Sequence, residues 1–322
     1  QLSIHRGHLQ MRLWDEAVQR LGTDQVRTGE RVVAARETAN GAVAEILHAD
    51  GTRSERACDI LVGADGIHSA LRQQFYPDEG APRWNGMMMW RGTTLARPFL
   101  DGRTMVQAGH RRAKFVVYPI EPVRPDGLQR INWICDRRLR EDGFGGGLTA
   151  PSREDWSKPG SLDDLLPTFG SWRFAWLDVP GLIRAAEQIL EWPMVDRDPL
   201  PRWRHGHTTL LGDAAHPMYP IGSNGATQAI LDAAALADAL DGHASITAAL
   251  NAYEAARLPM TRDIVAMNRR EGLDAILDMV EEAAPEGFAR IEDVTDPTVL
   301  AEWVQAYKKA AGHQVGRPQS AP

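Results

Sequence analysis

The chain has 322 residues, of which 43% are hydrophobic and 25% charged, so it is long enough for one large globular domain or two. Its 36 Lys and Arg residues against 43 Asp and Glu residues give a net charge of −7, which argues against a nucleic-acid-binding protein. We recognise neither a signal peptide nor an apolar run that could span a bilayer. The two cysteines, Cys58 and Cys135, lie in apolar strand-like runs, so we expect buried free thiols and a cytoplasmic protein without a membrane partner.

The first predicted element is a helix that follows Ser3, a residue type that favours the N-cap position. Its apolar face is formed by Leu9, Leu13, Ala17 and Leu21. Arg6 falls in the first turn, where the helix dipole disfavours a cation. A solvated arginine is the simpler interpretation of this position, and an anionic or polar partner is the alternative.

Residues 25–62 are predicted to form strands, with Asp50-Gly51 as the turn of a hairpin. The last of these strands enters residues 58–62. It is followed by Gly63-Ala64-Asp65-Gly66 and by a polar segment in which Ser69 is the expected N-cap of a short helix. The pattern therefore predicts a strand, a tight Gly/Asp turn and a helix.

Residues 82–138 have a different composition, with short runs of aromatic, Met and β-branched residues separated by turns. These runs, at 87–94, 104–108, 114–120 and 129–136, predict an antiparallel sheet. A Gly- and Pro-rich loop is expected at 139–160, and helices are expected after residue 240 with a tail from Gly312.

The most informative stretch runs from Thr208 to Leu240. It reads as a short apolar strand, a loop rich in Gly and Pro, and a helix of small residues. Backbone N–H groups from Gly222 to Gly225 stand at the start of that helix, where the helix dipole favours negative charge. Asp213 is an acceptor only when ionised, so a sugar or polyol hydroxyl is its expected partner. The alternative is that Asp213 only caps the turn that ends the strand.

These residues carry a family resemblance. Gly212-Asp213-Ala214-Ala215-His216, with Pro220, Gly222, Asn224, Ala226, Ala229 and Asp232, resembles the second FAD motif of the flavin-dependent aromatic hydroxylases, the class A monooxygenases. The amino-acid sequence of this motif is most similar to that of the phenazine and salicylate hydroxylase branch. Two further segments resemble that family: His5-Arg6 with Leu9 and Gln10 its H-R-x-x-L segment, and Asp65-Gly66 its "DG" motif.

The resemblance implies which residues contact the cofactor and the substrate. The implied FAD contacts are Arg6, Gln10, Asp65, Gly66, Asp213, Pro220, Gly222, Ser223, Asn224 and Gly225. Asp213 would bind the flavin ribitol in this reading, and Arg72 would help to fix the "DG" turn. The candidates to line the substrate pocket are Met89, Trp90, Phe115, Tyr118 and Trp133, although each of them is also a suitable core residue. No His/Cys cluster has metal-ligand spacing, so no metal site is expected.

The resemblance also implies the fold class, α/β (α+β): a partial Rossmann-like FAD-binding domain with an inserted antiparallel substrate-domain sheet and C-terminal helices. The expected boundaries are 1–80 for the FAD-binding domain, 81–200 for the substrate-binding sheet domain, 201–242 for the second FAD motif and its helix, and 243–322 for the C-terminal helices and tail. The chain begins at Gln1 and has no early G-x-G-x-x-G, so we expect the N-terminal βαβ unit of the family to be missing.

The activity that the resemblance implies is hydroxylation of an aromatic substrate with NADH or NADPH and O₂, through a flavin hydroperoxide. One alternative is another FAD-dependent oxidoreductase of the same superfamily, a reductase or a halogenase, although the W-x-W-x-I-P segment typical of halogenases is not present. A second alternative is an inactive remnant that binds no flavin. The colour of the purified chain would distinguish a flavoprotein from such a remnant.

Overall fold

The computed structural model describes residues 3–143, 148–151, 157–270 and 274–310. Parts of the predicted 139–160 loop and the tail from Gly312 lie outside these ranges. The chain divides into two compact units: unit 1 comprises residues 1–28, 85–143 and 150–194, and unit 2 comprises residues 29–84, 144–149 and 195–322. Each unit is described by itself. Within the described ranges, no helix is both long and apolar enough to cross a membrane.

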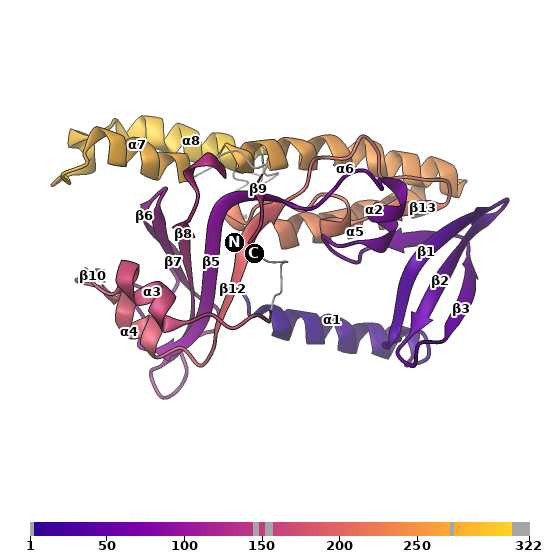
Figure 1. The fold of residues 1–322 in the computed structure, drawn as a ribbon, viewed down its shortest axis with the longest axis horizontal. Helices are drawn as coiled ribbons and strands as arrows, with labels where there is room; N and C mark the ends of the chain where they lie inside the picture. Colours follow the sequence, from indigo (N-terminus) through magenta and orange to yellow (C-terminus); the bar gives the residue numbers. More distant parts are fainter. Residues whose placement is uncertain (1–2, 144–147, 152–156, 271–273, 311–322) are drawn as a thin grey trace, which may run out of the picture. The chain divides into compact units, whose positions relative to one another are not determined.

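Unit 1 is built on a sheet with strand order β12-β5-β8-β7-β6, in which the pairs β5-β8, β8-β7 and β7-β6 are antiparallel (Figure 1). The strands are β5 (Arg83–Ala96), β6 (Val106–His110), β7 (Ala113–Pro119), β8 (Gln129–Arg138) and β12 (Ile189–Asp196). The first two residues of β5 belong to unit 2 and pair there with β9 (Leu148–Thr149), and the last two residues of β12 also belong to unit 2. The β-rich composition of residues 82–138 therefore predicted the correct type of structure.

The register of this sheet decides which side chains share a face. Trp90 is paired with Cys135, and Phe115 is paired with the same residue from the other side, so these three side chains lie on one face. Met89 is paired with Asp136, one residue further along, and therefore points to the opposite face. The two faces are called the aromatic face and the Met89 face below.

Helices and short strands complete unit 1. They are α1 (Arg6–Leu21), the 3₁₀ turn η1 (Glu141–Gly143), α3 (Leu162–Phe169), β10 (Arg173–Phe174), β11 (Leu177–Asp178) and α4 (Val179–Arg184). The ring of Phe169 lies 6.4 Å from that of Phe115, so α3 covers the aromatic face. The expected N-cap Ser3 is wrong: the side chain of His5 accepts from the backbone N–H of His8, and the helix begins one residue later.

Unit 2 contains two small sheets. β1 (Glu30–Thr38), β2 (Gly41–His48) and β3 (Arg53–Cys58) form an antiparallel meander, and the predicted hairpin at Asp50 joins β2 to β3. β4 (Leu61–Gly63) and β13 (Thr208–Leu210) form a parallel pair, in which Leu61 is opposite Thr208 and Gly63 is opposite Leu210. The expected strand over 58–62 is divided, because β3 and β4 belong to different sheets.

Helices make up the rest of unit 2. They are α2 (Ala70–Phe75), η2 (Gly212–Ala214), η3 (Ile221–Ser223), α5 (Gly225–Gly242), α6 (Ile246–Arg269), α7 (Ala275–Ala283), η5 (Ile291–Asp293) and α8 (Pro297–Ala310). α5 and α6 run side by side (Figure 1). The core between these helices and the parallel pair contains the fully buried Leu210, Leu250 and Tyr253, and the Tyr253 hydroxyl donates to the Leu210 carbonyl at 3.1 Å.

Candidate functional site

The parallel pair brings two of the predicted motifs together. Asp65 and Gly66 follow β4, and Gly212 and Asp213 follow β13. Because β4 and β13 are parallel neighbours, the segments that leave their carboxyl ends emerge at the same edge of the pair. Ligands of open α/β sheets bind outside the carboxyl ends of the strands, so this edge is the candidate binding site in unit 2.

The turn after β4 is held by its own polar groups. The Asp65 carboxylate accepts a hydrogen bond from the Ala70 N–H at 2.8 Å, and Gly66 has φ +80°, a conformation that favours glycine. Ser69 accepts from the Arg72 N–H at 3.0 Å, so the predicted N-cap of α2 is confirmed. Asp65 is therefore fixed against the start of α2 rather than free to rotate in solvent.

Arg72 connects this turn to the segment after β13. Its guanidinium is buried and donates to the backbone carbonyls of Ala214 and Ala215, at 3.2 and 2.8 Å. It also donates to the Asp198 carbonyl at 2.8 Å and pairs with the carboxylate of Glu79. A buried arginine that is satisfied on several sides holds the backbone of both motifs in a single arrangement.

The loop before α5 has the backbone geometry of a binding turn. Gly222 and Ser223 both have positive φ, +73° and +57°, and Ser223 adopts this conformation at a cost because it carries a Cβ. A Cβ placed on Gly225 would lie 3.9 Å from the Asp213 carboxylate, so Asp213 stands beside the first residue of α5. The side chain of Asn224 gives α5 no capping hydrogen bond.

These features fit an FAD-like ligand. The first-turn N–H groups of α5 receive no side-chain cap from Asn224, and they can donate to an anionic or carbonyl oxygen. Asp213 is exposed and can accept from a hydroxyl group. A polyol that carries an anionic or carbonyl-bearing ring matches this set of donors and acceptors.

A buried ionic network centred on Asp232 of α5 supports the loop. Its carboxylate accepts from the Gly212 N–H at 3.0 Å and from the Arg257 Nε at 2.7 Å, and it contacts His216 Nε2 at 2.5 Å. Burial by itself raises the pKa of Asp232, but the hydrogen bonds from His216, Arg257 and Gly212 outweigh burial and hold that pKa below its usual value. Asp232 therefore stays ionised and anchors both Gly212 and His216.

Arg257 and Gln228 are supporting residues that the sequence analysis missed. Arg257 comes from α6 and donates to the side chain of Gln228 at 2.6 Å as well as to Asp232. Asp232 was named only as one of the residues that resemble the second FAD motif. No local pattern marks Arg257, because it lies 25 residues further along the chain and meets Asp232 only through helix packing.

The five predicted substrate residues do not form one group. Trp90, Phe115 and Trp133 lie on the aromatic face, where they are buried: Trp90 Nε1 donates to Glu191 and Trp133 Nε1 donates to Thr94, both at 3.0 Å. The other two are Met89 and Tyr118, which lie on the Met89 face. Neighbouring residues of a strand point to opposite faces, so the sequence itself excludes a pocket lined directly by both Met89 and Trp90.

Arg6 and Gln10 belong to unit 1, where both are exposed on α1. Burial lowers the pKa of Arg91 of β5, and the charge of Arg6 lowers it further. The remaining predicted cofactor residues, Asp65 to Gly66 and Asp213 to Gly225, belong to unit 2. Contact of Arg6 and Gln10 with a cofactor stays a prediction.

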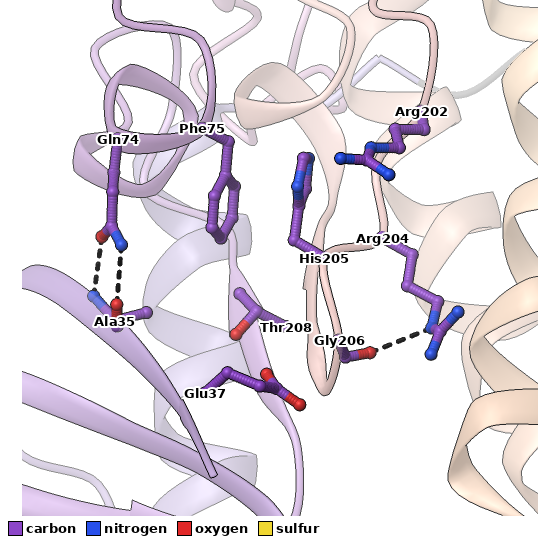
Figure 2. Close-up of a pocket in the computed structure, with 9 residues that line it drawn as sticks. All are labelled: Ala35, Glu37, Gln74, Phe75, Arg202, Arg204, His205, Gly206 and Thr208. Carbon is purple, nitrogen blue, oxygen red and sulfur yellow. Dashed lines mark hydrogen bonds between the residues drawn. The ribbon is translucent and has the colours of Figure 1, made fainter.

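One pocket of unit 2, of about 350 Å³, lies away from these residues. It is lined by Ala35, Glu37, Gln74, Phe75, Arg202, Arg204, His205, Gly206 and Thr208 (Figure 2). The rings of Phe75 and His205 stack with centroids 3.9 Å apart, and the Gln74 amide pairs with the backbone of Ala35. None of the predicted cofactor or substrate residues lines it. Where the chain is described, no cluster of three or more His, Cys, Asp or Glu residues could hold a metal ion.

Comparison with known proteins decides the family. Residues 8–146 and 180–268 match the family described as FAD binding domain, and these ranges include both strands of the parallel pair, the "DG" turn and the loop before α5. The chain belongs to this family of FAD-binding proteins. FAD as the cofactor of the family is thereby confirmed.

Two curated relatives show to which branch of the family the chain belongs. A phenazine 1,6-dicarboxylic acid hydroxylase, PhzS, of Lysobacter antibioticus is 46% identical over 276 residues, which cover 84% of this chain and 66% of the relative. A 3-amino-4-hydroxybenzoate 2-monooxygenase, PtnB3, of Streptomyces platensis is 36% identical over 252 residues, which cover 77% of this chain and 58% of the relative. The chain thus spans about three fifths to two thirds of the length of these relatives. The resemblance to the class A aromatic hydroxylases of the phenazine and salicylate branch is confirmed.

Solved structures confirm the fold class. A salicylate hydroxylase in complex with its substrate has a TM-score of 0.63 at 22% identity, with 95% of this chain and 76% of that chain covered. Klebsiella pneumoniae HpxO, complexed with FAD and uric acid, has a TM-score of 0.61 at 24% identity, with 93% and 67% covered. At these identities the likeness concerns the fold alone, which is the predicted α/β (α+β) fold of FAD-dependent hydroxylases.

Proposed function

We propose that this protein is an FAD-dependent monooxygenase that hydroxylates an aromatic substrate with NADH or NADPH and O₂. The observation that carries the proposal is the meeting of the "DG" turn and the Asp213 loop at the carboxyl ends of a parallel strand pair. Membership of the FAD-binding family and the hydroxylases among the relatives support it.

The chain's own contribution to this chemistry is electrostatic. Oxidation of the nicotinamide and activation of O₂ are the chemistry that FAD supplies when it is bound. The first-turn N–H groups of α5 receive no side-chain cap from Asn224, so they would be the groups that stabilise negative charge on a bound flavin. Asp213 would accept a hydrogen bond from a ribitol hydroxyl, and Asp65, which accepts from the Ala70 N–H, shapes the neighbouring turn with Gly66. No acid–base pair is needed among these residues.

Substrate recognition is assigned to unit 1. Of the five candidates, we keep Met89 and Tyr118 as substrate contacts, because both lie on the Met89 face in register with the polar residues Asp136 and Asn132, although Met89 is itself buried. Trp90, Phe115 and Trp133 are proposed to support the sheet from its other face, where their rings are buried against neighbouring aromatic and polar groups. The substrate class is a planar aromatic ring system, and molecular oxygen is the second reactant.

The cofactor part of the proposal is tested with Asp213→Ala. This change removes a charge-assisted hydrogen bond of about 1.5–3 kcal/mol, so FAD affinity should fall about tenfold or more. The matched control is Asp238→Ala, which removes an exposed aspartate further along α5. FAD binding is measured by quenching of flavin fluorescence. Equal FAD affinity of the Asp213→Ala variant and the control would show that Asp213 is only a turn residue.

The catalytic part is tested by oxidation of NADH and NADPH in the presence of FAD across a panel of phenols, aromatic acids and phenazines. Substrate-dependent oxidation should be accompanied by a product that is 16 mass units heavier, which corresponds to the insertion of one oxygen atom. The reactions are run with the purified chain. If no compound stimulates oxidation or yields a hydroxylated product, the assignment as a hydroxylase fails.

A further inference from the structure

The loop that precedes α5 lies on the C-terminal end of α6. Met218 of the loop is buried in a small apolar cluster with Ile264 and Val265 of α6. The backbone carbonyl of the next residue, Tyr219, accepts a hydrogen bond from the side-chain amide of Asn268 at 3.0 Å, and both of these residues are buried. Because a buried carbonyl needs its partner, the position of this part of the loop follows the position of α6.

Arg269, the last residue of α6, fixes this end of the helix. Its Nε and Nη2 donate to the two carboxylate oxygens of Asp196 at 2.7 and 2.9 Å, and its Nη1 donates to Asp198 at 2.7 Å. A second arginine, Arg83, donates from Nη1 to both carboxylate oxygens of Asp198 at 2.8 Å. We call these four residues the Arg269 clamp. A bidentate pair of arginine and carboxylate has one favoured geometry, so the clamp holds the end of α6 in one place.

The segment that carries the two aspartates is held on its other sides as well. Arg72 donates to the backbone carbonyl of Asp198 at 2.8 Å. Arg197 donates to the Ile67 carbonyl at 2.9 Å and to the Glu79 carboxylate at 3.1 Å. The segment is therefore a fixed point of attachment for α6.

Burial of the Asp196 carboxylate is energetically costly. The side chain is fully buried, and burial raises its pKa to about 6 although the hydrogen bonds from Arg269 lower it. A buried ion pair is poor evidence for stability, since an apolar pair of similar volume is often at least as stable. What the ion pair supplies, and an apolar pair does not, is a defined direction of contact.

The loop needs external support because its backbone is strained. Ser223 has φ +57°, and a strained residue keeps its conformation only where the surrounding structure determines it. Asp232 and Arg72 hold the backbone where the loop begins. Asn268 holds Tyr219 in the middle of the loop. The middle of the loop is thus tied to α6, and α6 is tied to the Arg269 clamp.

We propose that Arg269 is a positioning residue of the cofactor site. It fixes the end of α6 on Asp196 and Asp198, so that Asn268 holds the Tyr219 carbonyl and thereby sets the position of the loop and of the first-turn N–H groups of α5. Arg269 acts through these residues and does not itself touch the cofactor. This inference rests on the proposed function, in which the loop binds FAD.

The test is FAD binding to purified variants, measured by quenching of flavin fluorescence in a buffer well above the pKa of Asp196 and well below the unfolding temperature of each variant. Arg269→Met removes the donors, so FAD affinity should fall about tenfold, which corresponds to about 1.4 kcal/mol. Arg269→Lys keeps the charge without the paired donors, and its affinity should be intermediate. The matched control is Arg262→Met, which removes an exposed arginine of the same helix and should leave FAD affinity unchanged.

A double variant, Arg269→Met with Asp196→Leu, separates position from stability. Both buried charges are removed together, so the unfolding temperature should return toward that of the wild type, while FAD affinity should stay about tenfold weaker. This variant remains informative if Arg269→Met fails to fold. The second readout is the reduction potential of FAD bound at saturation. The potential should be more negative in both variants than in the wild type and Arg262→Met, because displaced N–H groups stabilise the reduced, anionic flavin less.

Three results would overturn the proposal. They are a wild type that binds no FAD, an Arg269→Met variant with the affinity and potential of the wild type, and a double variant that recovers affinity together with stability. The last result would make Arg269 a structural residue only. Failure of the proposed function has a different signature: FAD binding that depends on Arg269, without a hydroxylated product from any aromatic compound of the panel. Conversely, hydroxylation by a protein whose FAD affinity and potential do not respond to Arg269→Met would refute the positioning role alone.

Discussion

Replacement of Asp232 by alanine tests the idea that a buried ionic network holds the flavin loop. The carboxylate is fully buried and accepts from the Gly212 N–H, contacts His216 and pairs with Arg257, which is only 5% exposed. Asp232→Ala leaves the Arg257 guanidinium as a buried charge without its anion. Removing one partner of such a pair costs about 3–5 kcal/mol, because the remaining charge is not compensated.

The assay is chemical and thermal unfolding followed by circular dichroism. A loss of about 3–5 kcal/mol should lower the melting temperature by about 6–20 °C, at about 2–4 °C for each kcal/mol in a domain of this size. Asp238→Ala is the control, because Asp238 is exposed on the same helix and its removal should change the unfolding free energy by less than about 0.5 kcal/mol. Replacing both charges, in Asp232→Ala with Arg257→Met, should recover part of the loss.

The reasoning would be refuted by an Asp232→Ala protein that unfolds within about 1 kcal/mol of the wild type. A double variant that is less stable than Asp232→Ala would also contradict it, because Arg257 would then stabilise the fold through contacts other than Asp232. Either result would mean that Gly212 and His216 are held by packing against α5 rather than by the carboxylate.

Three other predictions follow from backbone geometry, packing and protonation. Ser223→Gly should raise the unfolding free energy by about 1 kcal/mol, because glycine adopts φ +57° without the cost of a Cβ; a less stable variant would contradict this. Gly92→Ala should destabilise the protein by about 1–3 kcal/mol, since its Cβ would lie 2.3 Å from the Trp133 ring, whereas Gly242→Ala, which meets nothing, should not. The pKa of Asp232 is lower in the folded state than in the unfolded state, so ionised Asp232 stabilises the fold above the unfolded pKa of about 3.9. This stabilisation is lost as the pH falls through the folded pKa. The difference in unfolding free energy between the wild type and Asp232→Asn should therefore disappear in acid and persist in neutral buffer.

The candidate flavin site could be predicted from the sequence because it is formed by contiguous segments whose residues favour the local conformation. Its strand, glycine turn and helix follow one another within the chain, and each step has a residue that suits it, such as Gly222 where φ is positive and Ser69 where α2 needs a cap. The family resemblance rests on the same short segments. The hairpin at Asp50 was predictable for the same reason, because the turn and both strands are contiguous.

Tertiary structure decided what depends on residues far apart in the chain. Arg257 meets Asp232 only because α6 packs beside α5, and Arg72 reaches the Asp213 segment across 142 residues. The alternation along β5 already separates Met89 from Trp90, but which residues of β7 and β8 join each of them depends on strand register. A shift of one residue would exchange the two faces, and hydrogen bonding between strands sets that register through contacts no single segment contains. Arg91 therefore acquired its partner Asn132 only when β5 paired with β8.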